Sequence, residues 1–162
     1  MIDIEIQNPN GFETLPKAID LQKWSEAALQ DNSQDCSVVL RFVDMQESSH
    51  LNSTYRHKEA ATNVLSFSYD SAEIIPEKFQ ELIPEPMHLG DLVLCEPLVK
   101  QEAQAQNKAL KQHWVHLITH GLLHLQGYDH IDENDAIIME ALEIKILDEQ
   151  GFANPYLEVI DS

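Results

Sequence analysis

Three histidines stand close together in the stretch His120-Gly121-Leu122-Leu123-His124-Leu125-Gln126-Gly127-Tyr128-Asp129-His130. Residues four apart lie on one face of a helix, so His120 and His124 can direct two imidazoles at one point. Gly127 stands where a helix commonly ends in a left-handed residue, a conformation that glycine adopts at low cost. The chain can then turn back and bring His130 to the same point. The stretch predicts a helix and turn that carry three metal ligands.

The type and number of these ligands indicate a catalytic zinc. Neutral imidazole is a favoured Zn²⁺ ligand, and three protein ligands leave a fourth position for water, whereas a structural site has four protein ligands. We therefore expect one zinc ion per chain, held by His120, His124 and His130. The two helical histidines could instead be stacked core residues among the surrounding leucines. Three histidines at this spacing, with a glycine between them, favour the metal.

The spacing resembles that of the metzincin proteases, His-Glu-x-x-His-x-x-Gly-x-x-His, at every metal-binding position and at the glycine. Gly121 stands where the proteases have their general-base glutamate, and glycine cannot take a proton from water. A metal can lower the pKa of bound water from about 15.7 towards about 7 without a carboxylate. The pattern favours a metal-dependent hydrolase that cleaves phosphodiesters, with peptide cleavage as an alternative.

Length and composition are typical of a single domain over residues 1–162, since 43% of the residues are hydrophobic. The first residues lack the basic segment and apolar run of a secretory signal, and no stretch approaches the ~20 apolar residues of a membrane span. We expect a cytoplasmic protein that has no membrane partner. Cys36 and Cys95 are isolated in the sequence and are predicted to be buried, reduced thiols.

Hydrophobic periodicity predicts strands and helices in mixed order. The expected strands cover residues 2–7, 37–43, 63–69 and 90–95, and the expected helices about 21–30, 46–55, 98–107, 110–126 and 133–150, the last ending at Gly151. Pro84-Glu85-Pro86 indicates a loop. The order of elements predicts an α+β fold, a small mixed β-sheet packed with helices, among them the metal-binding helix.

Three blocks of sequence resemble one known family. They are Leu51-Asn52-Ser53-Thr54-Tyr55-Arg56 with Thr62-Asn63-Val64-Leu65-Ser66-Phe67, then Leu89-Gly90-Asp91, and the histidine motif with Tyr128-Asp129. The blocks, and a tail with Met139, Leu142, Glu143 and Pro155-Tyr156, are similar to the YbeY endoribonucleases of bacterial ribosomal RNA maturation. Asn63 and Ser68 depart from the aspartate and proline that are usual in the family. Loss of an anion at Asn63 could alter the tuning of the metal site.

The resemblance implies a zinc-dependent, single-strand-specific endoribonuclease. Its implied roles are maturation of the 3′ end of 16S ribosomal RNA and ribosome quality control, with single-stranded or ribosomal RNA and the ribosome or its proteins as partners, and no DNA. It places the family's arginine at Arg56, whose planar guanidinium fits a phosphate. On residues alone, Arg56 would be expected in a surface salt bridge. His116, one turn before His120, could touch substrate, shuttle a proton or sit at the rim.

The net charge of −18 opposes RNA binding, because phosphates attract basic surfaces. A locally positive cleft would remove this conflict, and the candidate cations are Arg56, Lys58, Lys100, Lys108 and Lys111. The segment from Asp132 onward holds nine acids and one lysine, which predicts a solvated face directed away from RNA. This acidic face could alternatively meet a basic ribosomal partner.

Two other classes of function stay open. One is a metalloprotease or another metal-dependent hydrolase, which the ligand spacing favours and Gly121 opposes. The other is a non-catalytic ribosome-assembly factor with a structural, four-ligand metal. Asp129 could orient a ligand imidazole or serve as a turn residue. The remaining histidines are expected at the surface or in packing; they are His50, His57, His88 and His113.

Overall fold

A computed structural model describes residues 1–30, 35–68, 87–128 and 132–156. The described strands are β1 (Ile2–Gln7), β2 (Cys36–Val43), β3 (Val64–Ser68) and β4 (Met87–Cys95). The described helices are α1 (Ala18–Ala28), α2 (Met45–Arg56), α4 (Glu96–Ala105), α5 (Leu110–Leu125) and α6 (Glu133–Glu149). Each predicted element is present, although α1 begins earlier than expected and β4 begins three residues before Gly90. The predicted loop at Pro84-Glu85-Pro86 lies outside the described residues.

The four strands form one mixed sheet in the order β1-β2-β4-β3. β1, β2 and β4 are parallel, and β3 runs antiparallel to β4 at one edge. The parallel pairs need crossover connections, which contain α1 between β1 and β2 and α2 between β2 and β4. The predicted α+β fold with a small mixed sheet and packed helices is therefore confirmed.

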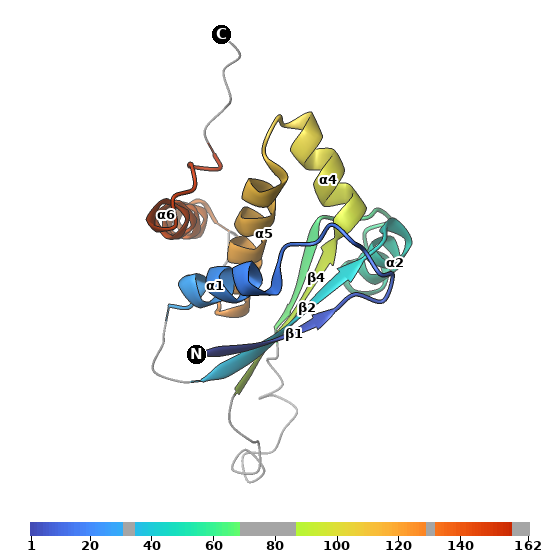
Figure 1. Ribbon diagram of the computed structural model, residues 1–162, viewed down its shortest axis with the longest axis horizontal. Coiled ribbons are helices and arrows are strands. Elements are labelled where there is room, and N and C mark those ends of the chain that lie inside the picture. Colours follow the sequence, from blue (N-terminus) through green and yellow to red (C-terminus); the bar gives the residue numbers. More distant parts are fainter. Residues whose placement is uncertain (31–34, 69–86, 129–131, 157–162) are drawn as a thin grey trace.

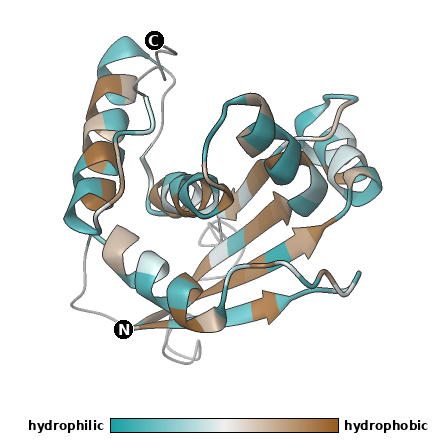
Figure 2. Ribbon diagram, turned by 45° about the horizontal axis from the view of Figure 1, so that its top comes forward, coloured by the Kyte–Doolittle hydropathy of each residue, from teal (hydrophilic) through white to brown (hydrophobic). Residues whose placement is uncertain are grey.

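The main core lies between the sheet and two helices, α1 and α5, as Figures 1 and 2 show. Alternate residues of β2 and β4 point into this layer, and residues between them are buried on the other face of the sheet, so parts of both strands read as apolar runs. At its centre, the rings of Phe42 and Trp114 meet edge to face with centroids 5.5 Å apart. Such an aromatic pair contributes about 0.5–1.5 kcal/mol beyond its buried area. This packing fixes α5 across the sheet.

The other helices cover the remaining sides. α2 packs on the opposite face of the sheet, where Val43, Val93 and Cys95 form a second small cluster. α6 packs along α5 through Leu123, Met139 and Ile146. The helix α5, which carries the motif histidines, is thus held between the sheet on one side and α6 on the other (Figure 1).

Close approach of the strands and α5 depends on Gly90 in β4. Its φ is +148°, and a Cβ there would lie 2.3 Å from the Phe67 carbonyl oxygen and 2.8 Å from a methyl group of Leu125. Only glycine fits this backbone and this space. The glycine therefore lets the end of α5 come close to β3 and β4. Of these elements, α5 and β3 border the cleft described below.

The two cysteines and the lengths of the helices bear on the predictions for the whole chain. Cys36 and Cys95 are both buried and unpaired with each other, as expected. In the portion of the chain that the structure covers, no helix has the length and apolar character needed to cross a membrane.

Candidate metal centre and cleft

The end of α5 sets the position of the second motif histidine. Gly127 has a φ of +100°, its amide donates to the His124 carbonyl at 3.0 Å, and the Tyr128 amide donates to the Leu123 carbonyl at 3.1 Å. This pair of bonds is a Schellman motif, which ends a helix at a left-handed glycine. The predicted stop at Gly127 is confirmed, and it places His124 in the last turn of α5.

His120 and His124 converge as their spacing predicts. Their Nε2 atoms are 3.1 Å apart, and their rings are nearly perpendicular with centroids 4.6 Å apart. Two imidazoles bound to one tetrahedral zinc at about 2.0–2.1 Å would have their nitrogens roughly 3.3 Å apart. The donor type and spacing therefore fit such an ion. His130, the third predicted ligand, lies outside the described residues, as does Asp129.

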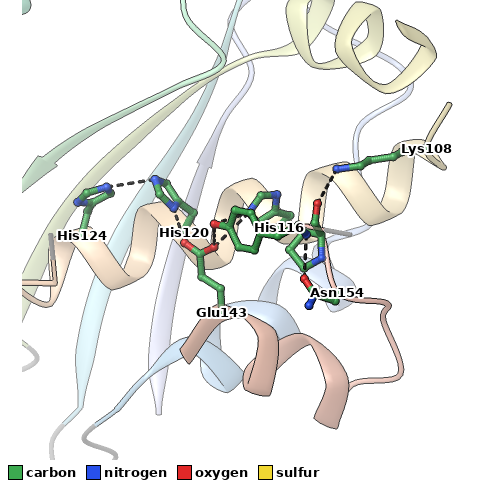
Figure 3. A network of polar contacts seen from close by, with 8 residues as sticks. Lys108, His116, His120, His124, Glu143 and Asn154 are labelled. Carbon is green, nitrogen blue, oxygen red and sulfur yellow. Dashed lines mark hydrogen bonds and ion pairs between the residues drawn. The ribbon is translucent and has the colours of Figure 1, made fainter. Parts of the chain in front are cut away.

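A buried carboxylate from α6 binds the same helix face (Figure 3). Glu143 is 0% exposed. Its Oε1 contacts His120 Nδ1, and its Oε2 lies 3.2 Å from His116 Nε2 and accepts a hydrogen bond from the Tyr156 hydroxyl. Three donors thus converge on one carboxylate. His120 accordingly lies between two neighbours, with Glu143 on its Nδ1 side and His124 on its Nε2 side.

These contacts determine the ionisation of Glu143. Burial by itself would raise the pKa of the carboxyl, but the hydrogen bonds from His116, His120 and Tyr156 outweigh it and lower the pKa to about 2. Burial and the neighbouring Glu143 carboxylate raise the pKa of the Tyr156 phenol. At neutral pH the cluster therefore contains a carboxylate that only accepts hydrogen bonds and a phenol that donates one.

His116, His120 and Glu143 could themselves hold a metal ion, because one potential ligand atom from each lies within 4.8 Å of the others. His120 is thus shared by two candidate donor sets. The first uses its Nε2 together with His124, and the second uses its Nδ1 together with His116 and Glu143.

The histidines form one side of a cleft with a volume of about 680 Å³. The other side is formed by the end of α2, by β3 and by the segment between them, which supply Arg56, Asn63 and Ser66. Two buried polar residues of α2 fix that segment. Ser48 Oγ donates to the Thr62 carbonyl at 2.8 Å, and Asn52 Nδ2 donates to the Ala60 carbonyl at 2.7 Å. These two hydrogen bonds therefore hold the start of β3 close to α2.

Arg56 is the last residue of α2, and its guanidinium lies at the cleft and forms no ion pair with any residue that the structure describes. It donates to the Ser66 carbonyl at 2.8 Å and sits 4.9 Å from the centroid of the Phe67 ring. Phe67 is partly buried, packs against the second cluster and contacts Tyr55 edge to face. The guanidinium is thus oriented by a carbonyl and an aromatic ring, and it keeps N–H groups available for an anion.

The charge of the cleft differs from that of the whole protein. Arg56 and Lys58 line it, and no carboxylate does among the described residues. The other three candidate cations lie elsewhere, so that part of the prediction is wrong: Lys100 pairs with Glu96, Lys108 donates to the Pro155 carbonyl, and Lys111 pairs with Asp20. A locally positive cleft nevertheless exists within a chain of net charge −18.

Asn63 belongs to a second histidine–carboxylate cluster. Its Nδ2 donates to Glu102 Oε1 of α4 at 3.0 Å, and the same oxygen lies 2.9 Å from Nε2 of the buried His113. Burial lowers the pKa of His113, against the opposing effect of Glu102. The amide at position 63 therefore contacts Glu102 directly, and the contacts described for it do not include the motif histidines.

The position of Gly121 excludes a protease-like base. A Cβ at this residue would lie 2.8 Å from one methyl group of Leu92 and 3.0 Å from the other. Gly121 therefore faces the packed sheet, and a glutamate side chain has no room there. The missing general base of the metzincin pattern is a consequence of close packing between α5 and β4.

Sequence reasoning did not assign a role to Glu143 or Tyr156. The expected solvated acidic face exists at Glu133, Asp135, Glu140, Asp148 and Glu149, which are exposed, but the prediction is wrong for Glu143. A signal was present, because Glu143 occupies an apolar position on α6 with Met139 four residues before it and Leu147 four residues after it. An acid in the buried stripe of a helix indicates a specific partner.

Comparison with known proteins identifies the family of this chain. The family model described as Endoribonuclease YbeY matches residues 5–151.

The chain belongs to the YbeY family.

Relatives named Endoribonuclease YbeY match almost the whole chain. One from Coxiella burnetii is 45% identical over 98% of this chain and 100% of its own length. Another from Methylococcus capsulatus is 46% identical over 98% of both chains. A solution structure of a Thermotoga maritima protein aligns with 97% of this chain at 19% identity, with a TM-score of 0.49. The family model and the relatives named Endoribonuclease YbeY confirm the family expected from the sequence blocks.

Proposed function

We propose that this chain is a zinc-dependent endoribonuclease that cleaves single-stranded RNA, with residues 1–162 acting as one hydrolase domain. The observation that carries the proposal is a cleft in which His120 and His124 direct their Nε2 atoms at one point while Arg56 and Lys58 supply positive charge. A phosphodiester is the substrate class that needs both features. The names of the YbeY relatives support the choice of RNA.

The proposed ligands are His120, His124 and His130, which would leave a coordination position for water. A zinc ion there would lower the pKa of water towards about 7 and supply the hydrolytic nucleophile. The Arg56 guanidinium is suited to bind the phosphate and to stabilise the charge that grows on its oxygens. His116 lies at the rim, and because its Nε2 contacts Glu143, it is better placed to hold that carboxylate than to move a proton.

The volume of the cleft and its positive charge support single-stranded RNA as the substrate. A volume of about 680 Å³ suits one or two nucleotides rather than a duplex. The exposed acids of α6 would repel RNA and leave the cleft as the favoured contact. The further proposal is action on the 3′ end of 16S ribosomal RNA and in ribosome quality control, where the acidic face of α6 could meet basic ribosomal proteins.

The test combines metal content with RNA cleavage. We expect about one zinc per chain by mass spectrometry and cleavage of a single-stranded RNA that carries the 3′ end of precursor 16S ribosomal RNA. His124→Ala should lose metal and cleavage together. His50→Ala is the matched control, because His50 is exposed on α2 away from the cleft. Bound metal without cleavage would favour the assembly-factor alternative, and cleavage of casein would favour a protease.

Arg56→Ala tests the second part of the site. Removing a donor that stabilises transition-state charge costs about 10²–10³ in turnover, so we expect a loss of that order with zinc content unchanged. Arg41→Ala is the control, because Arg41 forms its ion pair with Glu47 outside the cleft. Unchanged cleavage at equal zinc occupancy would remove Arg56 from the mechanism.

A further inference from the structure

Glu143 is the most buried charged group near the proposed metal centre. Its side chain is 0% exposed, and a buried carboxylate is costly unless hydrogen bonds compensate for the lost water. Here His120, His116 and Tyr156 all point their polar atoms at it. Such a concentration of donors on one buried anion does not arise from an ordinary surface contact. It requires a specific arrangement of α5, α6 and the segment that follows α6.

The segment after α6 is held in place by its own packing and hydrogen bonds. Phe152 contacts Trp24 edge to face, with ring centroids 6.3 Å apart. Lys108 donates to the Pro155 carbonyl at 3.1 Å, and the Tyr156 amide donates to Asn154 Oδ1 at 2.8 Å (Figure 3). These contacts bring the Tyr156 hydroxyl back over α5 to Glu143. The carboxylate is therefore supported from a second direction, by Tyr156 as well as by the histidines of α5.

The two nitrogens of His120 have different surroundings, and this difference sets its tautomer. An ionised carboxylate can only accept, so the proton of a neutral imidazole belongs on Nδ1, which faces Glu143. The lone pair then belongs to Nε2, the atom that lies 3.1 Å from His124 Nε2. Contact with Glu143 therefore turns the ring so that its ligand atom faces the point shared with His124.

We infer that Glu143 is a positioning residue of the metal centre, which holds His120 with Nε2 directed at the ion and does not itself bind the ion. The inference rests on the metal centre proposed above. It also decides between the two donor sets that share His120. A metal held by His116, His120 Nδ1 and Glu143 would have to displace the donors that now occupy both carboxylate oxygens. A metal held through His120 Nε2 leaves all these contacts in place, and His116 and Tyr156 then serve to fix the carboxylate.

The experiment measures zinc affinity of the full chain by competition with a chromophoric chelator, and counts ligands by X-ray absorption spectroscopy. Removal of a group that orients a ligand imidazole lowers metal affinity about 10–100-fold. Glu143→Gln should show a loss of that size with an unchanged set of imidazole ligands. His116→Ala should keep its affinity within a few fold, and His124→Ala should lose the metal. Glu140→Gln, an exposed acid of the same helix, is the matched control.

The His120 tautomer gives a readout that general destabilisation would not change. Nitrogen-15 correlation spectra of the zinc-loaded chain should show His120 protonated at Nδ1, and Glu143→Gln should shift that resonance specifically. If Glu143→Gln does not fold, Tyr156→Phe keeps the carboxylate and removes one donor, and we expect it to weaken zinc binding a few fold. Circular dichroism of each metal-free variant verifies the fold.

Several outcomes would overturn the inference. Glu143 would be a ligand if its replacement removed an oxygen from the zinc coordination shell and if His116→Ala also released the metal. It would have no positioning role if Glu143→Gln bound zinc as tightly as the unsubstituted chain. Failure of the unsubstituted chain to bind zinc and cleave RNA would instead refute the proposed function, so the two failures are distinguishable.

Discussion

The helix α5 contributes histidines to two histidine–glutamate clusters, which contain the same pair of residue types in different surroundings. Near its start, His113 contacts Glu102 of α4 and through it Asn63; in its second half, His116 and His120 contact Glu143 of α6. The difference lies in the second nitrogen of each ring. His113 Nδ1 is buried and has no hydrogen-bond partner among the residues described, whereas His120 Nε2 faces His124 at the cleft. The pair of His120 and Glu143 therefore has a second imidazole close to it, that of His124, and this is the pair that belongs to the proposed metal centre.

The burial of the two carboxylates follows the same division. Glu143 is 0% exposed and Glu102 is 28% exposed, so the first depends entirely on its protein partners and the second retains water. The Glu143 cluster therefore requires a fixed geometry, whereas the Glu102 cluster serves mainly to join α4, α5 and the start of β3. Removing a member of the Glu143 cluster should change metal binding, whereas removing a member of the Glu102 cluster should change the free energy of unfolding.

The largest expected effect is stabilisation by zinc. A ligand that binds only the folded state stabilises it by about 4 kcal/mol at a concentration ~1,000-fold above its Kd. We expect a gain of this size in denaturant unfolding of the unsubstituted chain with zinc present rather than with a chelator. His113→Gln should keep the gain and His124→Ala should lose it. Loss of the gain in His113→Gln would mean that the two clusters are not separate.

The same division explains what could be predicted from the sequence. The convergence of His120 and His124 and the end of α5 at Gly127 depend on residues a few positions apart, so helix geometry was sufficient to predict them. Arg56 at the cleft followed from the family resemblance. The roles of Glu143 and Tyr156 depend on how α6 and the following segment pack on α5, which periodicity does not specify. The charge pattern after Asp132 did not distinguish Glu143 as buried, because most acidic residues around it in the sequence are exposed.

Element boundaries show a related difference. α6 was predicted to begin at residue 133, where the Asp132 side chain accepts from the Asp135 amide at 2.8 Å and caps the helix. α1 begins at Ala18 after Lys17, which provides no side-chain cap, and its predicted start was late. The strand order β1-β2-β4-β3 depends on long-range pairing. Local signals therefore predicted the ends of elements better than the arrangement of the sheet.

A smaller effect is expected for His113→Gln measured without zinc. Loss of the contact with Glu102 should cost about 1–2 kcal/mol of unfolding free energy at pH 7. Burial lowers the pKa of His113 below its unfolded value of 6.5, so the unfolded chain binds more protons near and below that pH. The contribution of neutral His113 is therefore present above pH 6.5 and is lost as the pH falls through the folded pKa.

Chemical denaturation across this range provides the measurement. The difference in unfolding free energy between the unsubstituted chain and His113→Gln should shrink as the pH falls, and His50→Gln should show no such trend, because His50 is exposed. A difference that grows with acidity would show that Glu102 stabilises the charged form of His113 more strongly than burial opposes it.

The smallest expected effect is that of Asn63→Asp, which restores the aspartate usual in the family. The Asn63 amide now donates to Glu102 Oε1 at 3.0 Å, so an aspartate would replace a donor by a second carboxylate at the same distance. At neutral pH we expect a loss of about 1 kcal/mol and a raised pKa for His113, because the added negative charge favours the imidazolium. Glu102→Gln in the same chain should restore stability, since its amide can donate to the new carboxylate. Zinc affinity should not change, because the side-chain contacts described for Asn63 lie in the His113 cluster; a change would show that charge at position 63 acts across the cleft on the proposed metal centre.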